Sequence, residues 1–297
     1  MSSVRPATHA GSWYSADGDS LNRSLQAWLD AVRVGAAPAR AVPPPPPIAR
    51  SPVVSECMGV IAPHAGYRFS GPSAAWAYAC VDPAAFDRVF ILGPSHRVYL
   101  EGCALSGFTE LATPLGNLTV DHAANTGLAS TGLFKTMTPR IDEDEHSIEM
   151  HLPFVRKVFA GGSRFRYTRY TSASGARAID LTARTPPTVY AARPIYESIC
   201  ELDADAMRAI AFQPSSSAPV RNTCAQDAHA AFVSYLDETE NTVCGRNPIV
   251  LLLAVLKRSG EPCECAFMHY EQSSACETPS DSSVSYAAAY IRRVGAK

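Results

Sequence analysis

MGVIAPHAG, residues 58–66, and VFILGPSH, residues 89–96, decide the fold. Each begins with a short apolar run and continues into proline, glycine and histidine, a pattern that predicts a buried strand followed by a turn. Pro72 lies between them, at the predicted start of a helix over residues 73–81, because proline is favoured at the first helical position. A strand, a helix and a second strand with short links are typical of a parallel sheet, so the sequence predicts an α/β fold.

The rest of the chain adds elements to this unit. Residues 19–34 carry apolar side chains at helical spacing and predict an amphipathic helix. The other predicted elements are a partial helix over residues 142–159 that Pro153 ends or kinks, a helix opened by Asn247 and Pro248 that runs to Lys257 and is closed by Gly260, and strands over residues 263–270 and 284–291. We therefore expect a single domain over residues 1–297, with a largely parallel or mixed central sheet and helices on both faces.

Two segments read as irregular. Residues 38–52 contain five consecutive prolines, Pro43–Pro47, and predict an exposed proline-rich loop, since proline cannot continue a helix or a central strand. Residues 161–194 are rich in alanine, arginine, serine, threonine and proline and show little periodicity, which predicts an irregular insertion.

The composition narrows the classes of function. The chain has 297 residues and a net charge of −2, which gives no electrostatic argument for nucleic-acid binding. The first residues lack the pattern of a secretory signal, and no apolar run is long enough to insert in a membrane. Nine cysteines without regular spacing indicate free thiols in a reducing compartment, so we expect a cytoplasmic protein.

Three residues form a candidate metal site. His64 and His96 each follow a predicted buried strand, and the carboxyl ends of such strands are where ligands bind in α/β sheets. Imidazole suits zinc, copper or iron, but each histidine could equally cap its strand by hydrogen bonding. Cys244 lies just before a predicted helix, whose N-terminus favours thiolate. A buried thiol beside a turn is the alternative reading of Cys244.

The acidic run Asp142–His151 holds further candidates for chemistry. His146 and Glu149 would share one face of a helix at three-residue spacing and could be a general base, a ligand pair or a clamp behind a ligand. A solvated acidic helix start is the alternative. The sequence contains no glycine-rich phosphate loop and no Gly-x-Ser-x-Gly elbow, so nucleotide binding and serine-hydrolase chemistry have no support.

Six motifs together resemble the Memo family (mediator of ErbB2-driven cell motility). They are His9-Ala-Gly-Ser-Trp-Tyr14, Ala62-Pro-His-Ala-Gly-Tyr67, Ile91-Leu-Gly-Pro-Ser-His96, Asp142–Pro153 (DEDEHSIEMHLP), Thr242-Val-Cys-Gly-Arg246 and Asp281-Ser-Ser-Val-Ser-Tyr286. Their order and spacing match the family over roughly residues 8–160 and 193–292.

The resemblance implies a fold similar to that of class III extradiol (LigB-like) dioxygenases, with one iron or copper ion as cofactor. The family's two metal-binding histidines correspond to His64 and His96 here, and its cysteine corresponds to Cys244. The resemblance also implies copper-dependent oxidant production, cell motility and cytoskeletal signalling, and binding of phosphotyrosine peptides.

One departure from the family pattern lies between Phe154 and Arg164. The family normally has a long strand–helix–strand segment there, with an Asp-Phe-Cys-His-Trp-Gly stretch that brings another aspartate and histidine to the pocket. We therefore expect an incomplete middle crossover that exposes apolar sheet edges and opens one side of the pocket. We also expect that acid–base groups are lost. The sequence therefore supports metal binding more strongly than it supports ring-cleaving dioxygenase activity.

Two functions follow as hypotheses. The first is a metal-dependent redox protein, in which a thiolate in place of the usual carboxylate favours copper(I) and disfavours ordinary ring cleavage. The second is a non-catalytic adaptor that binds a phosphotyrosine-containing or other signalling peptide in the pocket. Arg246 and Arg97 would then receive the phosphate or carboxylate. For either function we expect a monomer in the cytoplasm, with the nucleus as a second location.

Overall fold

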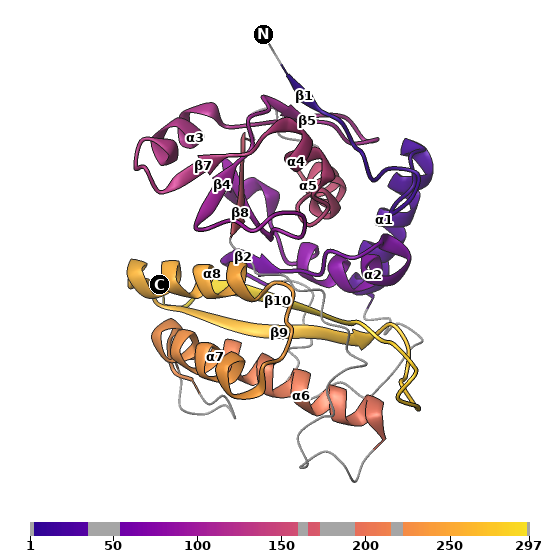
Figure 1. Ribbon diagram of the computed structural model, residues 1–297, viewed down its shortest axis with the longest axis vertical. Helices are drawn as coiled ribbons and strands as arrows, with labels where there is room; N and C mark the ends of the chain where they lie inside the picture. Colours follow the sequence, from indigo (N-terminus) through magenta and orange to yellow (C-terminus); the bar gives the residue numbers. More distant parts are fainter. Residues whose placement is uncertain (1–2, 35–53, 160–165, 173–193, 215–221, 296–297) are drawn as a thin grey trace.

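The computed structural model describes residues 3–34, 54–159, 166–172, 194–214 and 222–295, and it has an α/β fold (Figure 1). The predicted proline-rich loop at 38–52 lies outside the described residues. So does most of the predicted insertion at 161–194, of which residues 166–172 form a strand. Within the described parts, no helix combines the length and the apolar character that crossing a bilayer requires.

Among the described residues the strands form three sheets, whereas the sequence predicted one central sheet. The first sheet has the order β1-β5-β6, the second β2-β10-β9, and the third β3-β8-β4-β7. The bounds are β1 Val4–Arg5, β2 Cys57–Ile61, β3 Arg88–Pro94, β4 Cys103–Leu105, β5 Glu110–Leu111, β6 Leu118–Thr119, β7 Phe134–Thr136, β8 Arg166–Ser172, β9 Cys263–Gln272 and β10 Ser285–Arg293. The second sheet is antiparallel, whereas the first and third mix parallel and antiparallel pairs.

The predicted strand–helix–strand unit is present, but its two strands are not neighbours. β2 pairs with β10 in antiparallel fashion, and β3 pairs with β8 in parallel fashion. Two of the predicted strands, β2 and β3, are thus the edges of separate sheets among the described residues.

Helices pack around the sheets in the two halves seen in Figure 1. Their bounds are α1 Gly18–Arg33, α2 Tyr67–Tyr78, α3 His122–Ala129, α4 Pro139–Asp144, α5 Leu152–Val158, α6 Ile195–Ile210, α7 Ala225–Thr239 and α8 Arg246–Ser259, with 3-10 turns at Pro83–Ala85 and Glu149–His151. Helices α1, α2 and α5 share one apolar core, and α6 to α8 share another with β9 and β10.

The sequence placed the end of α8 correctly, since Gly260 ends it in the left-handed region at a φ of 66°. Helix α1 was expected to be capped by Asp19 or Ser20, but it begins at Gly18, and Asp17 caps it by accepting a hydrogen bond from the Ser20 N–H at 2.8 Å. The expectations for two prolines were wrong. Pro72 lies inside α2, which begins at Tyr67, and Pro153 lies in the first turn of α5 and does not end it.

Candidate metal centre

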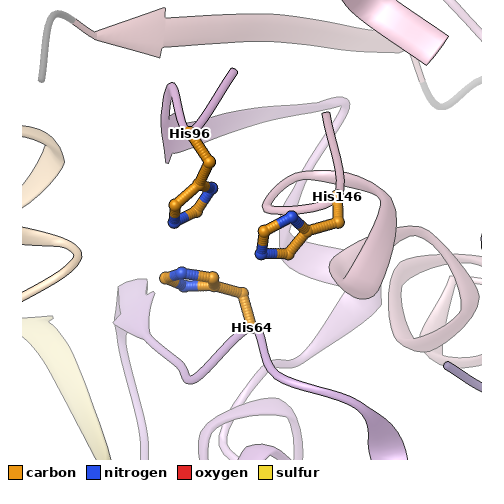
Figure 2. A group of neighbouring side chains, drawn as sticks. All are labelled: His64, His96 and His146. Carbon is orange, nitrogen blue, oxygen red and sulfur yellow. The ribbon is translucent and has the colours of Figure 1, made fainter. Parts of the chain in front are cut away.

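Four side chains from different parts of the chain meet at the carboxyl ends of β2 and β3. His64 follows β2, and His96 follows β3 by two residues. His146 comes from the connection between α4 and the 3-10 turn at Glu149–His151, and Cys244 comes from the residues just before α8. Figure 2 shows the three histidine rings turned toward one another.

The three histidines form a cluster that could hold a metal ion. One ring nitrogen from each of His64, His96 and His146 lies within 4.8 Å of the others. The rings of His96 and His146 stack with centroids 4.3 Å apart, and the His64 centroid lies 5.3 Å from that of His96.

Cys244 lies against two of these histidines. Its Sγ is 2.7 Å from Nε2 of His96 and 3.4 Å from Nε2 of His64. Cys244 lies two residues before the start of α8, as the sequence suggested. The structure therefore brings together the three residues that the sequence nominated, although they are up to 180 residues apart in the chain.

A buried carboxylate orients His96. Glu145 Oε1 lies 2.8 Å from Nδ1 of His96, and Glu145 Oε2 accepts the backbone N–H of His96 at 2.6 Å. With Nδ1 held by the carboxylate, Nε2 is the ring nitrogen that faces Cys244. Glu145 was not nominated from the sequence, although it stands inside the acidic run next to His146.

The environment shifts the protonation of the cluster. Burial lowers the pKa of His64 well below its ordinary value, and repulsion from the neighbouring histidines, when these are protonated, acts in the same direction. Burial also lowers the pKa of His146 to about 4. Burial acts in the same direction on His96, but hydrogen bonds to Cys244 and Glu145 outweigh it and raise the pKa to about 9. The imidazoles of His64 and His146 are thus neutral at neutral pH, which is the form that binds metal.

The other nominated residues take different places. Glu149 is fully buried, and its oxygens accept hydrogen bonds from Arg5, the His9 backbone and Tyr14 at 2.6–2.8 Å. His146 and Glu149 do not lie together in the predicted helix, because α4 ends at Asp144 and the 3-10 turn begins only at Glu149. Besides His96, Trp13 packs on His146, with ring centroids 4.4 Å apart, a contact that sequence reasoning missed.

The two arginines nominated for peptide binding lie beside the cluster in sequence. Arg97 directly follows His96, is exposed, and donates a hydrogen bond from Nε to the Asp144 carbonyl at 3.1 Å. Arg246 is partly buried and is the first residue of α8.

The sequence of the chain is similar to those of known proteins. A family model described as "Memo-like protein" matches residues 5–169 and 161–290. Protein MEMO1 of Danio rerio is 38% identical over 334 residues, which cover 96% of this chain and 96% of the relative. Protein MEMO1 of Homo sapiens is 36% identical over 334 residues with the same coverage, and the memo-1 homolog of Caenorhabditis elegans is 36% identical over 324 residues, covering 97% of this chain and 82% of the relative.

The alignments also bear on the expected gap. The two matched ranges of the family model overlap at residues 161–169. The alignment with the Danio rerio protein extends over 334 residues, which is more than the 297 residues of this chain. That relative therefore carries residues for which this chain has no counterpart.

Proposed function

Because the chain belongs to the Memo-like protein family, we propose that it binds one iron or copper ion through His64, His96 and Cys244. We propose further that the ion serves a redox role linked to cell motility and cytoskeletal signalling. The observation that carries the proposal is the position of the Cys244 sulfur, 2.7 Å from Nε2 of His96 and 3.4 Å from Nε2 of His64.

The donor set fits such an ion. In a tetrahedral site with nitrogen at about 2.0 Å and sulfur at about 2.3 Å, nitrogen and sulfur ligands lie about 3.5 Å apart. The pair formed by His64 and Cys244, at 3.4 Å, is close to this spacing, and the pair formed by His96 and Cys244, at 2.7 Å, would open when a metal ion binds between them. His146 supplies a further nitrogen in the same cluster. Two imidazoles and a thiolate are ligands that copper and iron accept.

The protein's own groups prepare the site. Glu145 holds the ring of His96 through its contact with Nδ1, and Trp13 packs against His146. When bound, the metal would supply one-electron redox chemistry. The thiolate stands where ring-cleaving dioxygenases have a carboxylate, so we do not expect ordinary extradiol cleavage.

The test compares two exposed free cysteines, Cys244 and Cys224. Each is replaced by serine, and the purified proteins are loaded with copper(I) or iron(II), desalted without oxygen and assayed for metal by mass spectrometry. We expect about one ion per chain in the unsubstituted protein and in Cys224→Ser, and a strong loss in Cys244→Ser. Equal metal content in all three proteins would contradict the proposal.

A second candidate function is an adaptor that binds a phosphotyrosine-containing or other signalling peptide beside the cluster. The exposed Arg97, adjacent to His96, favours it, because a guanidinium in this position can bind phosphate through two parallel hydrogen bonds. We propose Arg97 and Arg246 as the peptide-binding residues, and we place either function in a monomer in the cytoplasm and the nucleus.

Fluorescence polarisation with a tyrosine-phosphorylated peptide and its unphosphorylated twin tests the adaptor function. Arg97→Ala and Arg246→Ala should weaken binding of the phosphorylated peptide, whereas Arg140→Ala, at an exposed arginine of α4, should not. Equal binding of the two peptides, or no effect of either pocket variant, would count against it.

A further inference from the structure

A cavity of about 620 Å³ extends along β2, β3 and α8. Every residue of β2 lines it, and so do all residues of β3 except Gly93. Helix α8 adds further aliphatic side chains, among them Ile249, Leu252 and Leu256. Small-molecule sites have volumes of about 300–1,000 Å³ and are lined mainly by apolar side chains, so this cavity has the size and the lining of such a site. We call it the apolar cavity.

The apolar cavity has one polar corner. The side chains in its lining that can form hydrogen bonds are Cys57, His64, Tyr78, Arg88 and His151. Three of them are close together, because the Tyr78 hydroxyl lies 3.1 Å from Nδ1 of His151, and a charge on His151 acts on His64. Tyr78 and His151 are only 6% and 8% exposed. A few polar groups that converge in an apolar pocket are what fixes the orientation of a bound small molecule.

One nitrogen of His151 remains for a ligand. Nδ1 is in contact with the Tyr78 hydroxyl, whereas Nε2 has no hydrogen-bond partner in the part of the chain that the structure describes. A buried polar group without a partner costs free energy, so a ligand that supplies the missing hydrogen bond is stabilised there.

We infer that the apolar cavity binds an uncharged apolar alcohol, whose hydroxyl group is held by His151 and Tyr78 and whose hydrocarbon part lies along β2, β3 and α8. A hydroxyl group both donates and accepts hydrogen bonds, so it matches Nε2 whichever ring nitrogen of His151 carries the proton. A ketone oxygen only accepts and an ammonium group only donates, so each of them matches a single tautomer.

A charged head group is disfavoured in this corner. Burial lowers the pKa of His151 to about 4, so at neutral pH its ring carries no charge that could pair with a carboxylate. The guanidinium in the lining is already paired, since Nε of Arg88 lies 2.6 Å from Oδ2 of Asp121. A fatty acid would therefore lose the hydration of its carboxylate without full compensation, whereas an alcohol of the same length loses much less.

The test compares 1-decanol with decanoate, which share one hydrocarbon chain and differ in the head group. Ligand-observed NMR titrations with the full chain at pH 7 measure both affinities. We expect decanol to bind roughly tenfold or more tightly than decanoate. His151→Leu and Tyr78→Phe should each weaken decanol binding by roughly fivefold. Tyr286→Phe, at a buried tyrosine that does not line the cavity, should leave it unchanged.

Two exposed valines provide matched variants that leave the core intact. Val255 lines the apolar cavity and is 55% exposed, whereas Val284 is 54% exposed and does not line it. A tryptophan at the first position should obstruct the cavity, so Val255→Trp should weaken decanol binding by roughly tenfold and Val284→Trp should not.

Several results would overturn the inference. They are no binding of decanol, equal or tighter binding of decanoate, an unchanged affinity for decanol in both His151→Leu and Tyr78→Phe, and equal effects of the two tryptophan variants. The protein is treated with a chelator and assayed without metal, so a failure of this inference and a failure of the proposed metal site appear in different experiments.

Discussion

Glu145 holds His96 at two points, with one carboxylate oxygen 2.8 Å from Nδ1 and the other accepting the His96 backbone N–H at 2.6 Å. The same carboxylate accepts the Ser147 N–H at 2.8 Å. Burial works to raise the pKa of Glu145, but the bonds to His96 and Ser147 outweigh it and lower the pKa to about 2. His96 is thus held in place by the Glu145 carboxylate, which is ionised at neutral pH.

Replacement of Glu145 by glutamine should weaken metal binding about 10–100-fold, because an amide neither fixes the His96 tautomer nor raises its basicity as a carboxylate does. Competition against a coloured chelator of copper(I) or iron(II) measures the affinity. Asp144→Asn is the control, since Asp144 is adjacent in sequence and exposed. An affinity of Glu145→Gln equal to that of the control would show that Glu145 does not support the site.

Local signals predicted the elements that carry the site, but they did not predict how the strands pair. The apolar runs before His64 and His96 are strands as predicted, because burial and turn residues are encoded within a few positions. The partners of β2 and β3 come from residues 285–293 and 166–172, so their pairing depends on contacts that no local pattern contains. For the same reason the sequence could not show that β2 and β3 belong to separate sheets.

The site itself was predicted in part. Strand ends and a helix start singled out His64, His96 and Cys244, and the resemblance to the Memo family joined them. His146 was considered together with Glu149 on an assumed helix. Helix α4 instead ends at Asp144, before His146, and His146 stacks on His96 whereas Glu149 belongs to a buried network with Arg5. Helical spacing predicts neighbours only where both residues lie in one continuous helix.

Arg5 should be among the residues most sensitive to substitution. Its side chain is fully buried, with Nε 2.9 Å from Asp142 Oδ1 and Nη1 2.6 Å from Glu149 Oε2. Arg5→Ala leaves two buried carboxylates without their cation and should lower the free energy of unfolding by about 3–5 kcal/mol. Arg33→Ala removes an exposed pair with Asp30 at 3.1 Å and should cost about 1 kcal/mol or less. Urea unfolding of both variants checks the contrast, and similar losses would contradict it.

Two helical glycines should respond to alanine in opposite ways. A Cβ at Gly71 in α2 would overlap the Trp28 ring of α1, whereas a Cβ at Gly127 in α3 would meet nothing within 4 Å. Gly71→Ala should therefore destabilise the protein by about 1–3 kcal/mol through overpacking. Gly127→Ala should stabilise it by about 0.5–1 kcal/mol, because alanine loses less backbone entropy in a helix. Thermal unfolding measures both, and a stabilised Gly71→Ala would refute the close packing of α1 on α2.

Glu149 should make stability depend on acid pH. Burial alone would raise its pKa, but the Arg5 charge and hydrogen bonds from His9 and Arg5 hold the pKa of Glu149 below its ordinary 4.5. The unfolded chain then binds the proton more tightly than the folded chain does. The stabilisation is complete above pH 4.5 and is lost as the pH falls through the lower pKa of the folded state.

Urea midpoints measured from about pH 6 to about pH 3 check this dependence. Glu149→Gln should be less stable than the unsubstituted protein near neutral pH, and the two curves should approach each other at acid pH, because protonation removes the charge that the substitution also removes. Glu101→Gln, at an exposed carboxylate, should keep the slope of the unsubstituted protein. If Glu149→Gln kept that slope as well, the acid sensitivity would have to arise from other carboxylates, and the Arg5–Glu149 pair would not control it.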